Sequence, residues 1–491
     1  MLRLETLDAD LDAHLDVLRH EASAVTRSRA LVEAALVDGE AHYGVNTGFG
    51  ALKSVRIDAS DVAALQENLL RSHAVGVGAI LPKTLSRTML RLKIYALGLG
   101  FSGVSVPVFE RLLEMERLGL TPVVPSRGSL GASGDLAPLA HLALPLLGEG
   151  QLWDDGRPAP AADVLARHGL GPVPLGAKDG LALINGTQFM AAHAARVCQK
   201  AQNLVAVADL VAAMSLDALR GSLAPFDERV HAVRPHPGHG TVAANVRRLM
   251  DGSEILPSHA GCNRVQDPYS LRCVPQVHGA SRDALAYVSQ TVETEVNSVT
   301  DNPLVFAGDG GAPVLISAGN FHGQPLALAM DMAAIALAEL ANIAERRTYL
   351  LVDGFDELPP FLVPGSGLLS GFMIVQYAAA ALVSENKTLC HPASVDSIPS
   401  SKGQEDHVSM GAWGAIKALQ VAENVERVLA MELLCAAQAL DYRRPLRSGR
   451  AVEAAHALVR SRVPFRTADA TFEVDLAAAT DLVASGALST L

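Results

Sequence analysis

The sequence predicts a mainly α-helical protein built around a bundle of long helices. Of its 491 residues, 49% are hydrophobic but only 4% are aromatic, and alanine and leucine dominate. Small and straight-chain apolar residues favour closely packed helices over sheet. Within residues 327–347, apolar side chains recur at steps of three and four, the period of one helix face. A smaller N-terminal region with short helices and a few strands is expected before the bundle.

The first region, residues 1–185, is predicted to alternate short helices with glycine-rich breaks. Charged helices are expected over residues 1–40, followed by a glycine-rich loop at 44–50. That loop lacks the glycine spacing and the lysine of a phosphate-binding cradle. Residues 60–120 are predicted to be helical, with breaks at two pairs of glycines. The Gly-, Pro- and Asp-rich stretch 149–180 predicts an excursion with a small hairpin.

The central region, residues 186–440, carries the predicted long helices, and residues 441–491 are expected to form a C-terminal helical segment. The helical patterns cover residues 188–221, 275–300, 325–352 and 405–440, with a loop at 353–370. Several of these patterns are apolar around most of the helix circumference. Such helices are buried on most sides, which favours packing against other subunits as well as against one another.

Composition and charge narrow the classes of partner. The formal net charge of −12 argues against nucleic acid and anionic membrane as main partners. The five cysteines show no C-x-x-C spacing, which indicates a reduced, cytoplasmic protein. The N-terminus lacks a signal-peptide pattern, and apolar runs such as 371–383 are too short for a membrane span. The spacing of His231, His236 and His239 does not fit a metal site, so no metal is expected.

The stretch from Gly131 to Asp135 is the most informative motif. In Ala132-Ser133-Gly134, the Gly134 nitrogen can attack the Ala132 carbonyl carbon and close a five-membered ring, because glycine allows the required bend. Loss of two waters, one of which carries the Ser133 oxygen, leaves a methylidene-imidazolone with an electron-poor methylene. The alternatives are an ordinary loop and a nucleophilic serine. The serine-nucleophile pattern does not fit, because its second glycine falls one place early and prolines interrupt the preceding strand.

Polar side chains that can meet such an electrophile are scattered along the chain. Tyr43 precedes the glycine-rich loop, Asn185 lies within an apolar run, and Gln404–His407 is expected to open a helix. Taken singly, such features are also typical of core packing, of a solvated helix face and of an acidic helix start. Three further polar residues, spaced by three and therefore predicted on one helical face, are Gln266, Tyr269 and Arg272.

Together these segments resemble the histidine ammonia-lyases, within the family of aromatic amino acid ammonia-lyases that depend on a methylidene-imidazolone. The resemblance extends across almost the entire chain and follows one order. The matching blocks are residues 43–50, 72–78, 128–141, 180–188, 266–273, 297–303, 319–322, 391–397 and 404–410. So many blocks in order are specific for a family that builds its electrophile from Ala-Ser-Gly.

The resemblance implies a mainly α fold of the fumarase/aspartase type, assembled as a homotetramer whose active sites draw residues from three subunits. It implies elimination of ammonia from L-histidine to give trans-urocanate. The electrophile would be 4-methylidene-imidazol-5-one formed from Ala132, Ser133 and Gly134. No external cofactor is implied.

The family's motifs also imply roles for single residues. Tyr43 would be the base that takes the β-proton, and Arg272 would bind the substrate carboxylate with its planar guanidinium. Asn185 and Tyr269 would support the electrophile and the amine. Asp135 is expected to cap the following helix, whose backbone amides would hold the electrophile's oxygen. The implied pocket lining includes Gln266 and Phe321.

Substrate choice is expected to depend on His73 and Glu405, which match the histidine-type pattern. Both can hydrogen-bond an imidazole, whereas an apolar ring leaves each unpaired at about 1–3 kcal/mol. Ser401–Gly403 departs from the pattern of many family members beside Glu405. The same chemistry on tyrosine or phenylalanine, a 2,3-aminomutase, and a catalytically silent helical scaffold are the alternatives.

Overall fold

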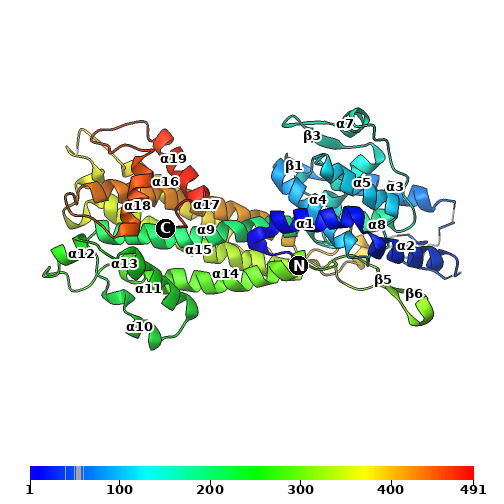
Figure 1. Cartoon of the computed structure of the whole chain (residues 1–491), viewed down its shortest axis with the longest axis horizontal. Helices are drawn as coiled ribbons and strands as arrows, with labels where there is room; N and C mark the ends of the chain where they lie inside the picture. Colours follow the sequence, from blue (N-terminus) through cyan, green and yellow to red (C-terminus); the bar gives the residue numbers. More distant parts are fainter. Residues whose placement is uncertain (39, 49, 51–56, 59, 366) are drawn as a thin grey trace. The chain divides into compact units, whose positions relative to one another are not determined.

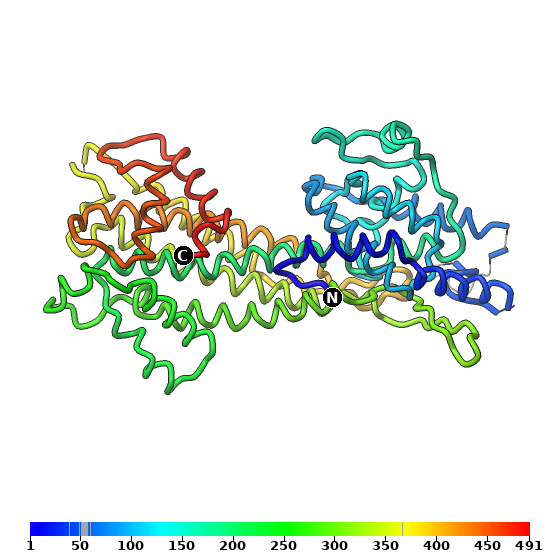
Figure 2. Tube along the Cα trace, viewed as in Figure 1, coloured from blue at the N-terminus to red at the C-terminus, as the bar shows by residue number. Residues whose placement is uncertain are grey.

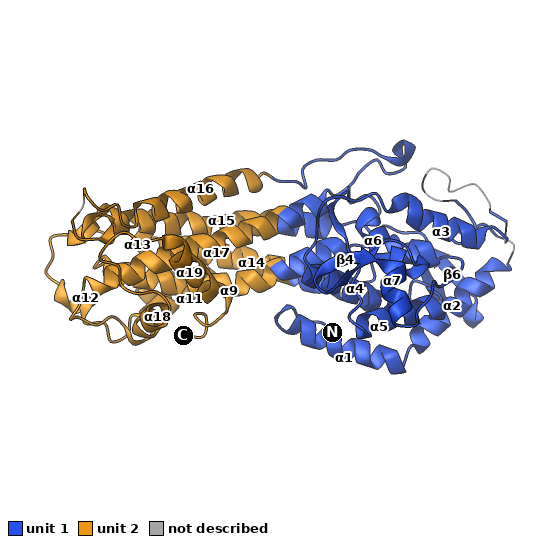
Figure 3. Ribbon diagram, turned by 90° about the horizontal axis from the view of Figure 1, so that it is seen from above, with its two compact units in different colours: residues 1–196, 290–330, 392–416 blue, residues 197–289, 331–391, 417–491 orange. Residues whose placement is uncertain are grey.

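The computed structural model describes residues 1–491 except 39, 49, 51–56, 59 and 366. The described chain divides into two compact units (Figure 3). Unit 1 comprises Met1–Arg196, Gln290–Met330 and Pro392–Ile416, and unit 2 comprises Val197–Ser289, Asp331–His391 and Lys417–Leu491. Each unit therefore combines segments that are far apart in the sequence. The predicted regions 1–185, 186–440 and 441–491 describe an order along the chain and stay a prediction.

Unit 1 begins with short helices, as predicted (Figure 1). The first of them carries acidic residues in its first turn and basic residues in its last turn, which suits the helix dipole. The helices before residue 186 are α1 (Leu7–His20), α2 (Ser23–Leu36), α3 (Val62–His73), α4 (Lys83–Gly98), α5 (Val106–Arg117), α6 (Leu136–Ala143), α7 (Ala161–Arg167) and α8 (Asp179–Ile184).

The described strands are short and form two-stranded antiparallel sheets. They pair as β1 (Val77–Ile80) with β2 (Pro125–Arg127), β3 (Gln151–Asp154) with β4 (Arg157–Pro160), and β5 (Leu304–Ala307) with β6 (Pro313–Ile316). The β3–β4 pair confirms the hairpin predicted within 149–180. Its turn is Asp155-Gly156, and both residues have positive φ, as a tight two-residue hairpin turn requires.

The predicted long helices are confirmed as α9 (Gln188–Ala218), α14 (Val274–Val296), α15 (Gln324–Asp353) and α17 (Gly411–Asp441). Figure 2 traces their course along the chain. The start of α17 differs from the prediction, because Gln404–His407 does not open a helix. Ser401–Gly403 forms a 3-10 turn instead, and Ser400 pairs with Glu405 in an antiparallel bridge before α17 begins.

Helix α15 shows how the apolar pattern becomes burial. Ala333, Leu337 and Leu340 are fully buried on one face. On the other face, Leu328 and Met332 expose 50% and 43% of their surface. Exposed apolar surface in a row is typical of a protein interface. The predicted packing against other subunits stays a prediction.

Among the described helices, α9 and α15 are long and apolar enough to cross a membrane by length and composition. The prediction that apolar runs fall short of a membrane span is therefore wrong for these helices. Within the structure, however, 78% of the apolar window of α9 and 72% of that of α15 are buried. The burial that the sequence predicted is present.

The shorter helices of unit 2 connect and cover the long ones. They are α10 (Glu228–Ala232), α11 (Pro237–Leu249), α12 (Ile255–Ser258), α13 (Tyr269–Arg272), α16 (Met373–Leu389), α18 (Arg450–Arg460) and α19 (Phe472–Ala484). Because α13 is only one turn long, it contains Tyr269 and Arg272 but not Gln266. The predicted single helical face for all three residues is therefore wrong, and Pro268 marks the point at which the helix starts.

A buried ion pair links the long helices of unit 2. Arg347 on α15 donates to the Glu432 carboxylate on α17 at 2.5 and 2.8 Å, and both side chains are completely buried. Ser215 on α9 donates to the same carboxylate at 2.6 Å. Arg347 also donates to the Ser270 carbonyl oxygen in α13 at 3.5 Å. One charged pair thus ties three long helices and the short helix that carries Arg272.

Replacing Glu432 with alanine is expected to lower the free energy of unfolding by about 3–5 kcal/mol, because it leaves a buried guanidinium without its partner. The change is measured from urea unfolding followed by circular dichroism. The matched control is Arg229→Ala, which removes an exposed ion pair with Asp227 and is expected to shift stability by less than about 0.5 kcal/mol. Equal shifts in the two variants would contradict this account.

Candidate active site

A cavity of about 700 Å³ in unit 1 brings several of the predicted site residues together. Its polar lining includes Tyr43, His73, Ser133, Asn185 and Glu405. Apolar side chains from α3, α6 and α8 form much of the remaining wall, and these helices pack against one another. The combination of an apolar wall and a few convergent polar groups is typical of a small-molecule site.

Local structure explains how each polar group reaches the cavity. Ser133 lies just before α6, and Asn185 is the residue that ends α8. His73 is the last residue of α3. Glu405 follows the 3-10 turn, and Tyr43 precedes the glycine-rich loop. The site is therefore built from helix ends and loops, where side chains are not needed for helix packing.

The segment that carries Ser133 makes a close backbone contact. Gly134 has a φ of +75° and pairs with Gly186 in a parallel bridge. The Asp135 N–H donates to the Gly186 carbonyl oxygen at 2.8 Å. A Cβ atom on Gly134 would lie 2.1 Å from that oxygen. Glycine at 134 is thus required by space and by backbone angle, and its nitrogen has no side chain shielding it, as ring closure needs.

Ser133 and Glu405 are hydrogen-bonded across the cavity. The Ser133 hydroxyl donates to Glu405 Oε1 at 3.2 Å. The other carboxylate oxygen, Oε2, accepts a hydrogen bond from the Ser400 hydroxyl at 2.5 Å. Glu405 is therefore held from the side of its own loop, and its Oε1 faces the predicted electrophile.

Asn185 presents an open acceptor to the site. Its Nδ2 donates to the Asn302 carbonyl oxygen at 3.4 Å, while its Oδ1 is buried without a partner among the described residues. A buried polar atom without a partner is unfavourable, and such atoms are typical of functional sites. The Oδ1 atom is suited to accept an N–H from a bound amine.

The environment of Tyr43 does not favour a base within a single chain. Burial raises the pKa of Tyr43, and the Glu405 carboxylate raises it further. The Gly50 N–H, which donates to the Tyr43 hydroxyl at 3.3 Å, lowers that pKa. The phenol is thus less acidic than usual here.

His73 lies at the cavity with its imidazole close to Ser72, whose Oγ is 3.0 Å from His73 Nδ1. Burial lowers the pKa of His73, whereas the Leu69 carbonyl and the Glu405 carboxylate raise it. A lowered pKa favours the neutral ring at neutral pH. A neutral imidazole has one donor and one acceptor nitrogen, so it can meet either kind of nitrogen of a second imidazole.

Asp135 occupies the expected N-cap position of α6, but its carboxylate does not form a cap hydrogen bond. Its oxygens accept instead from the Met190 N–H at 3.0 Å and from the Ser129 hydroxyl at 2.9 Å. The side chain is completely buried, and burial raises the pKa of Asp135 to about 7. The carboxyl group therefore anchors the start of α9 to the electrophile segment.

Other predicted residues do not line this cavity. Gln266, Tyr269 and Arg272 belong to unit 2, where the Arg272 guanidinium lies over the Tyr269 ring at 4.6 Å. Gln266 is exposed in a bend. Phe321 lies in unit 1 in a turn after β6, half-buried and outside the lining. Their roles stay predictions.

Some lining residues could not be singled out from the sequence by their chemistry. Asn68 and the apolar residues of α3 reach the cavity because Leu65, Leu69 and Ser72 follow one helix face. These residues could have been found from the sequence by taking the positions that precede His73 at steps of three and four along the predicted helix. Lys402, noted only as a departure from the family pattern, also lines the cavity.

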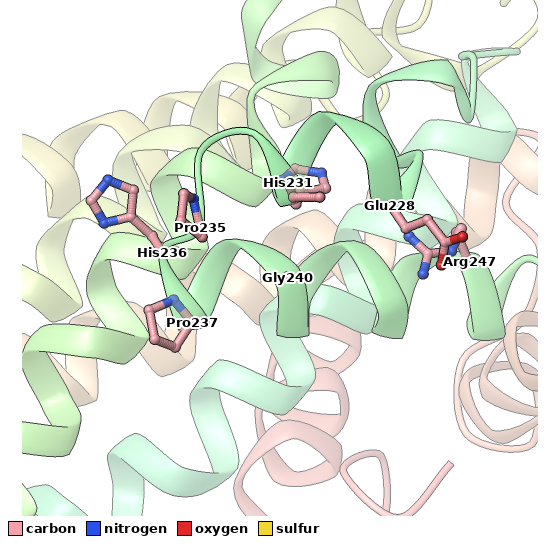
Figure 4. A pocket seen from close by; sticks show the side chains of 8 residues that line it. Glu228, His231, Pro235, His236, Pro237, Gly240 and Arg247 are labelled. Carbon is pink, nitrogen blue, oxygen red and sulfur yellow. The ribbon is translucent and has the colours of Figure 1, made fainter.

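A second cavity, of about 310 Å³, lies in unit 2 beside α10 and α11 (Figure 4). Its His231 Nε2 is 3.1 Å from the Pro225 carbonyl oxygen, and its Arg247 guanidinium donates to the Phe226 carbonyl oxygen. These two side chains are already hydrogen-bonded to backbone oxygens, so this cavity is a weaker candidate for the active site. Within the described part of the chain, no group of three or more His, Cys, Asp or Glu residues could hold a metal ion.

Replacing Gly134 with alanine is expected to destabilise the protein and to remove activity, because the new Cβ would collide with Gly186. The matched control is Gly156→Ala. Gly156 has a similar φ of +78°, but a methyl group added to it would meet nothing within 4 Å, so it carries only the backbone penalty of about 1–2 kcal/mol. Thermal unfolding and activity are measured for both. Equal behaviour of the two variants would contradict the close-contact argument.

Comparisons with known proteins identify the family. A family model described as aromatic amino acid lyase matches residues 4–461. A histidine ammonia-lyase of Sorangium cellulosum is 56% identical over 474 residues, covering 96% of this chain and 92% of that protein. One from Deinococcus radiodurans is 53% identical, covering 96% and 91%.

Solved structures agree. Histidine ammonia-lyase from Trypanosoma cruzi matches with a TM-score of 0.88 and 42% identity, covering 97% of this chain and 92% of that one. Tyrosine aminomutase from Streptomyces globisporus matches with a TM-score of 0.89 and 38% identity, covering 97% and 95%. These matches confirm the predicted mainly α fold. The chain belongs to the aromatic amino acid lyase family.

Proposed function

We propose that this chain eliminates ammonia from L-histidine to give trans-urocanate. The observation that carries the proposal is the unit 1 cavity, where the predicted source of the electrophile, Ser133, lies 3.2 Å from the predicted imidazole partner Glu405. The 56% identity to a histidine ammonia-lyase over nearly the whole chain supports the same reaction and substrate.

The electrophile is proposed to be 4-methylidene-imidazol-5-one made from Ala132, Ser133 and Gly134. The residues present fit this group, since Gly134 has an unshielded nitrogen in a tight backbone contact, and Asn185, whose Oδ1 can accept an N–H of the substrate amine, lines the same cavity as Ser133. When formed, the group supplies an electrophilic methylene that helps an otherwise unreactive amino acid lose ammonia.

Glu405 is proposed to bind the substrate imidazole. Ring closure removes the Ser133 hydroxyl as water, so Glu405 Oε1 loses its present donor and becomes available to a substrate N–H. The Ser400 hydroxyl keeps the other oxygen in place. The carboxylate thereby holds the imidazole within reach of the methylene carbon, which derives from Ser133 Cβ.

Tyr43 is proposed to take the β-proton from the substrate while the Cα–N bond breaks and a Cα–Cβ double bond forms. Because burial and Glu405 raise its pKa, Tyr43 needs a cation nearby to act as a phenolate. We propose that Arg272 of a neighbouring subunit supplies this charge and binds the substrate carboxylate. Arg272 is suited to this because its Nε is buried without a partner among the described residues.

We also propose a homotetramer in the cytoplasm, with active sites shared between subunits. The exposed apolar residues of α15 support assembly, since free helices of soluble proteins rarely expose such a row. All cysteines of the chain are unpaired, which supports a reducing compartment.

The replacement Ser133→Ala is expected to abolish ring formation and to lower turnover of L-histidine by at least about 1,000-fold, roughly 4 kcal/mol in activation free energy. Intact mass is the direct measurement. The unaltered protein should be lighter than its sequence by two water molecules, whereas S133A should have its full sequence mass. The exposed Ser461→Ala variant should behave like the unaltered protein. An unaltered protein with full sequence mass would refute the electrophile.

The replacement Glu405→Gln is expected to lower kcat/KM for L-histidine about 5- to 150-fold, because the loss of a charged hydrogen-bond acceptor costs about 1–3 kcal/mol. Urocanate absorbance measures the rate, and tyrosine and phenylalanine are assayed in parallel. Glu473→Gln, at an exposed position, is the control. A chain that is unchanged towards histidine, or that prefers tyrosine before mutation, would favour the tyrosine-specific alternative.

A further inference from the structure

Four charged side chains are buried in unit 1 near the segment that carries Ser133. They are Lys93 on α4, Lys178 at the start of α8, Asp135 before α6 and Asp301 before β5, exposed by only 2%, 0%, 0% and 3%. We name them the buried quartet. Burying charges is unfavourable unless each is well partnered. The hydrogen-bond partner of each charged group therefore indicates why that group is buried.

Lys178 is paired in the usual way, since its Nζ donates to Asp301 Oδ2 at 2.8 Å. Lys93 is not. Its Nζ donates to the backbone carbonyl oxygen of Asn185 at 2.6 Å, and no carboxylate of the described residues lies within ion-pair distance of it. A completely buried ammonium is thus used to fix one peptide group. That peptide joins Asn185 to Gly186.

Gly186, the residue that follows this carbonyl group, contacts the ring-forming segment. Lys93 holds the Asn185 oxygen, in the peptide that precedes Gly186. The Gly186 oxygen, in the next peptide, accepts the Asp135 N–H at 2.8 Å, and Gly134 packs against it. A displacement of Gly186 would move Gly134 as well.

A second anchor fixes the other end of the segment. The Leu130 and Gly131 carbonyl oxygens accept the Met410 and Ser409 N–H groups at 3.3 and 3.4 Å. The residues between Gly131 and Asp135 are therefore held at both ends. Only the Asp135 end depends on Gly186, and Lys93 holds the carbonyl group that precedes Gly186.

We propose that Lys93 is a positioning residue for ring formation: by fixing the Asn185 carbonyl, it holds Gly186, whose oxygen accepts the Asp135 N–H, and so keeps the Gly134 nitrogen where it can attack the Ala132 carbonyl carbon. The proposal rests on the proposed electrophile. In the reaction, the Gly134 N–Ala132 C bond forms, and the Ala132 oxygen leaves as water with the Gly134 and Ser133 N–H hydrogens. The Ser133 hydroxyl then leaves as a second water with the Ser133 Cα hydrogen.

The charges around Lys93 agree with this role. Burial lowers the pKa of Lys93 to about 8, the Lys178 charge acts in the same direction, and the Asp301 and Asp135 carboxylates oppose that shift. Protonated or neutral, the Lys93 nitrogen carries N–H donors for the Asn185 oxygen.

The test replaces Lys93 with methionine, which keeps the length of the side chain but removes the donor and the charge. The matched control is Lys417→Met in unit 2. Lys417 is also buried, with 3% of its surface exposed, and its Nζ also donates to a backbone oxygen, that of His391. Each variant is purified as folded protein, checked by circular dichroism, and digested. Mass spectrometry of the peptide that spans residues 132–134 then gives the fraction that has lost two waters.

The expected result is complete loss of two waters in the unaltered protein and in K417M, and at least a tenfold lower cyclised fraction in K93M. Full cyclisation in K93M, or an equal decrease in K417M, would overturn the role of Lys93. If K93M does not accumulate as folded protein, Lys93→Gln is used, because its amide keeps a donor at a shorter reach. K93Q is then expected to cyclise incompletely, and complete cyclisation would overturn the proposal. An unaltered protein without the mass loss would instead refute the electrophile.

Discussion

The hydrogen bond from the Asp135 N–H to the Gly186 oxygen is the contact on which the site depends. It joins the loop before α6 to the end of α8, and so it brings Ser133 beside Asn185. Helices α3, α6 and α8 pack against one another around this point. Apolar packing alone has no direction and would tolerate a small slip between helices. The backbone contact at Gly134 does not tolerate such a slip, because a Cβ at this position would lie 2.1 Å from the Gly186 oxygen. Glycine at 134 therefore permits both this close contact and the proposed ring closure.

Much of the fold was predictable because its determinants are local. The three- and four-residue period of α15 specified its buried face, and Asp155-Gly156 specified the turn of the β3–β4 hairpin. The start of α17 was not predictable in the same way. The acidic residues at 404–407 resemble a helix start, but Ser400 pairs with Glu405 through both backbone and side chain and holds the segment out of the helix. Here a pairing outside the helix outweighed local propensity.

The residues of the candidate site also differ in how far they could be predicted from the sequence. Tyr43, His73, Asn185 and Glu405 were predictable because they lie in sequence blocks that resemble the family's motifs, and the structure places them around one cavity. Lys93 was not, because a lysine in a helical pattern normally indicates a solvated face. Its partner, the Asn185 oxygen, is a backbone atom 92 residues away, and no residue type in the sequence reports it. The supporting contacts of a site are therefore harder to predict than the groups that touch substrate.

Tyr43 links the site to assembly. A tyrosine that is half-buried beside a carboxylate is a poor base, since both burial and the negative charge of Glu405 favour the protonated phenol. The carboxylate that we propose to bind the substrate imidazole therefore opposes ionisation of the proposed base. A guanidinium near the cavity would favour the phenolate, and we propose Arg272 as its source; the helix that carries Arg272 contacts the buried Arg347–Glu432 pair. If that guanidinium comes from a neighbouring subunit, the proposed base can act only in the assembled protein. The exposed apolar residues of α15, which favour assembly, and the basicity of Tyr43 are then linked.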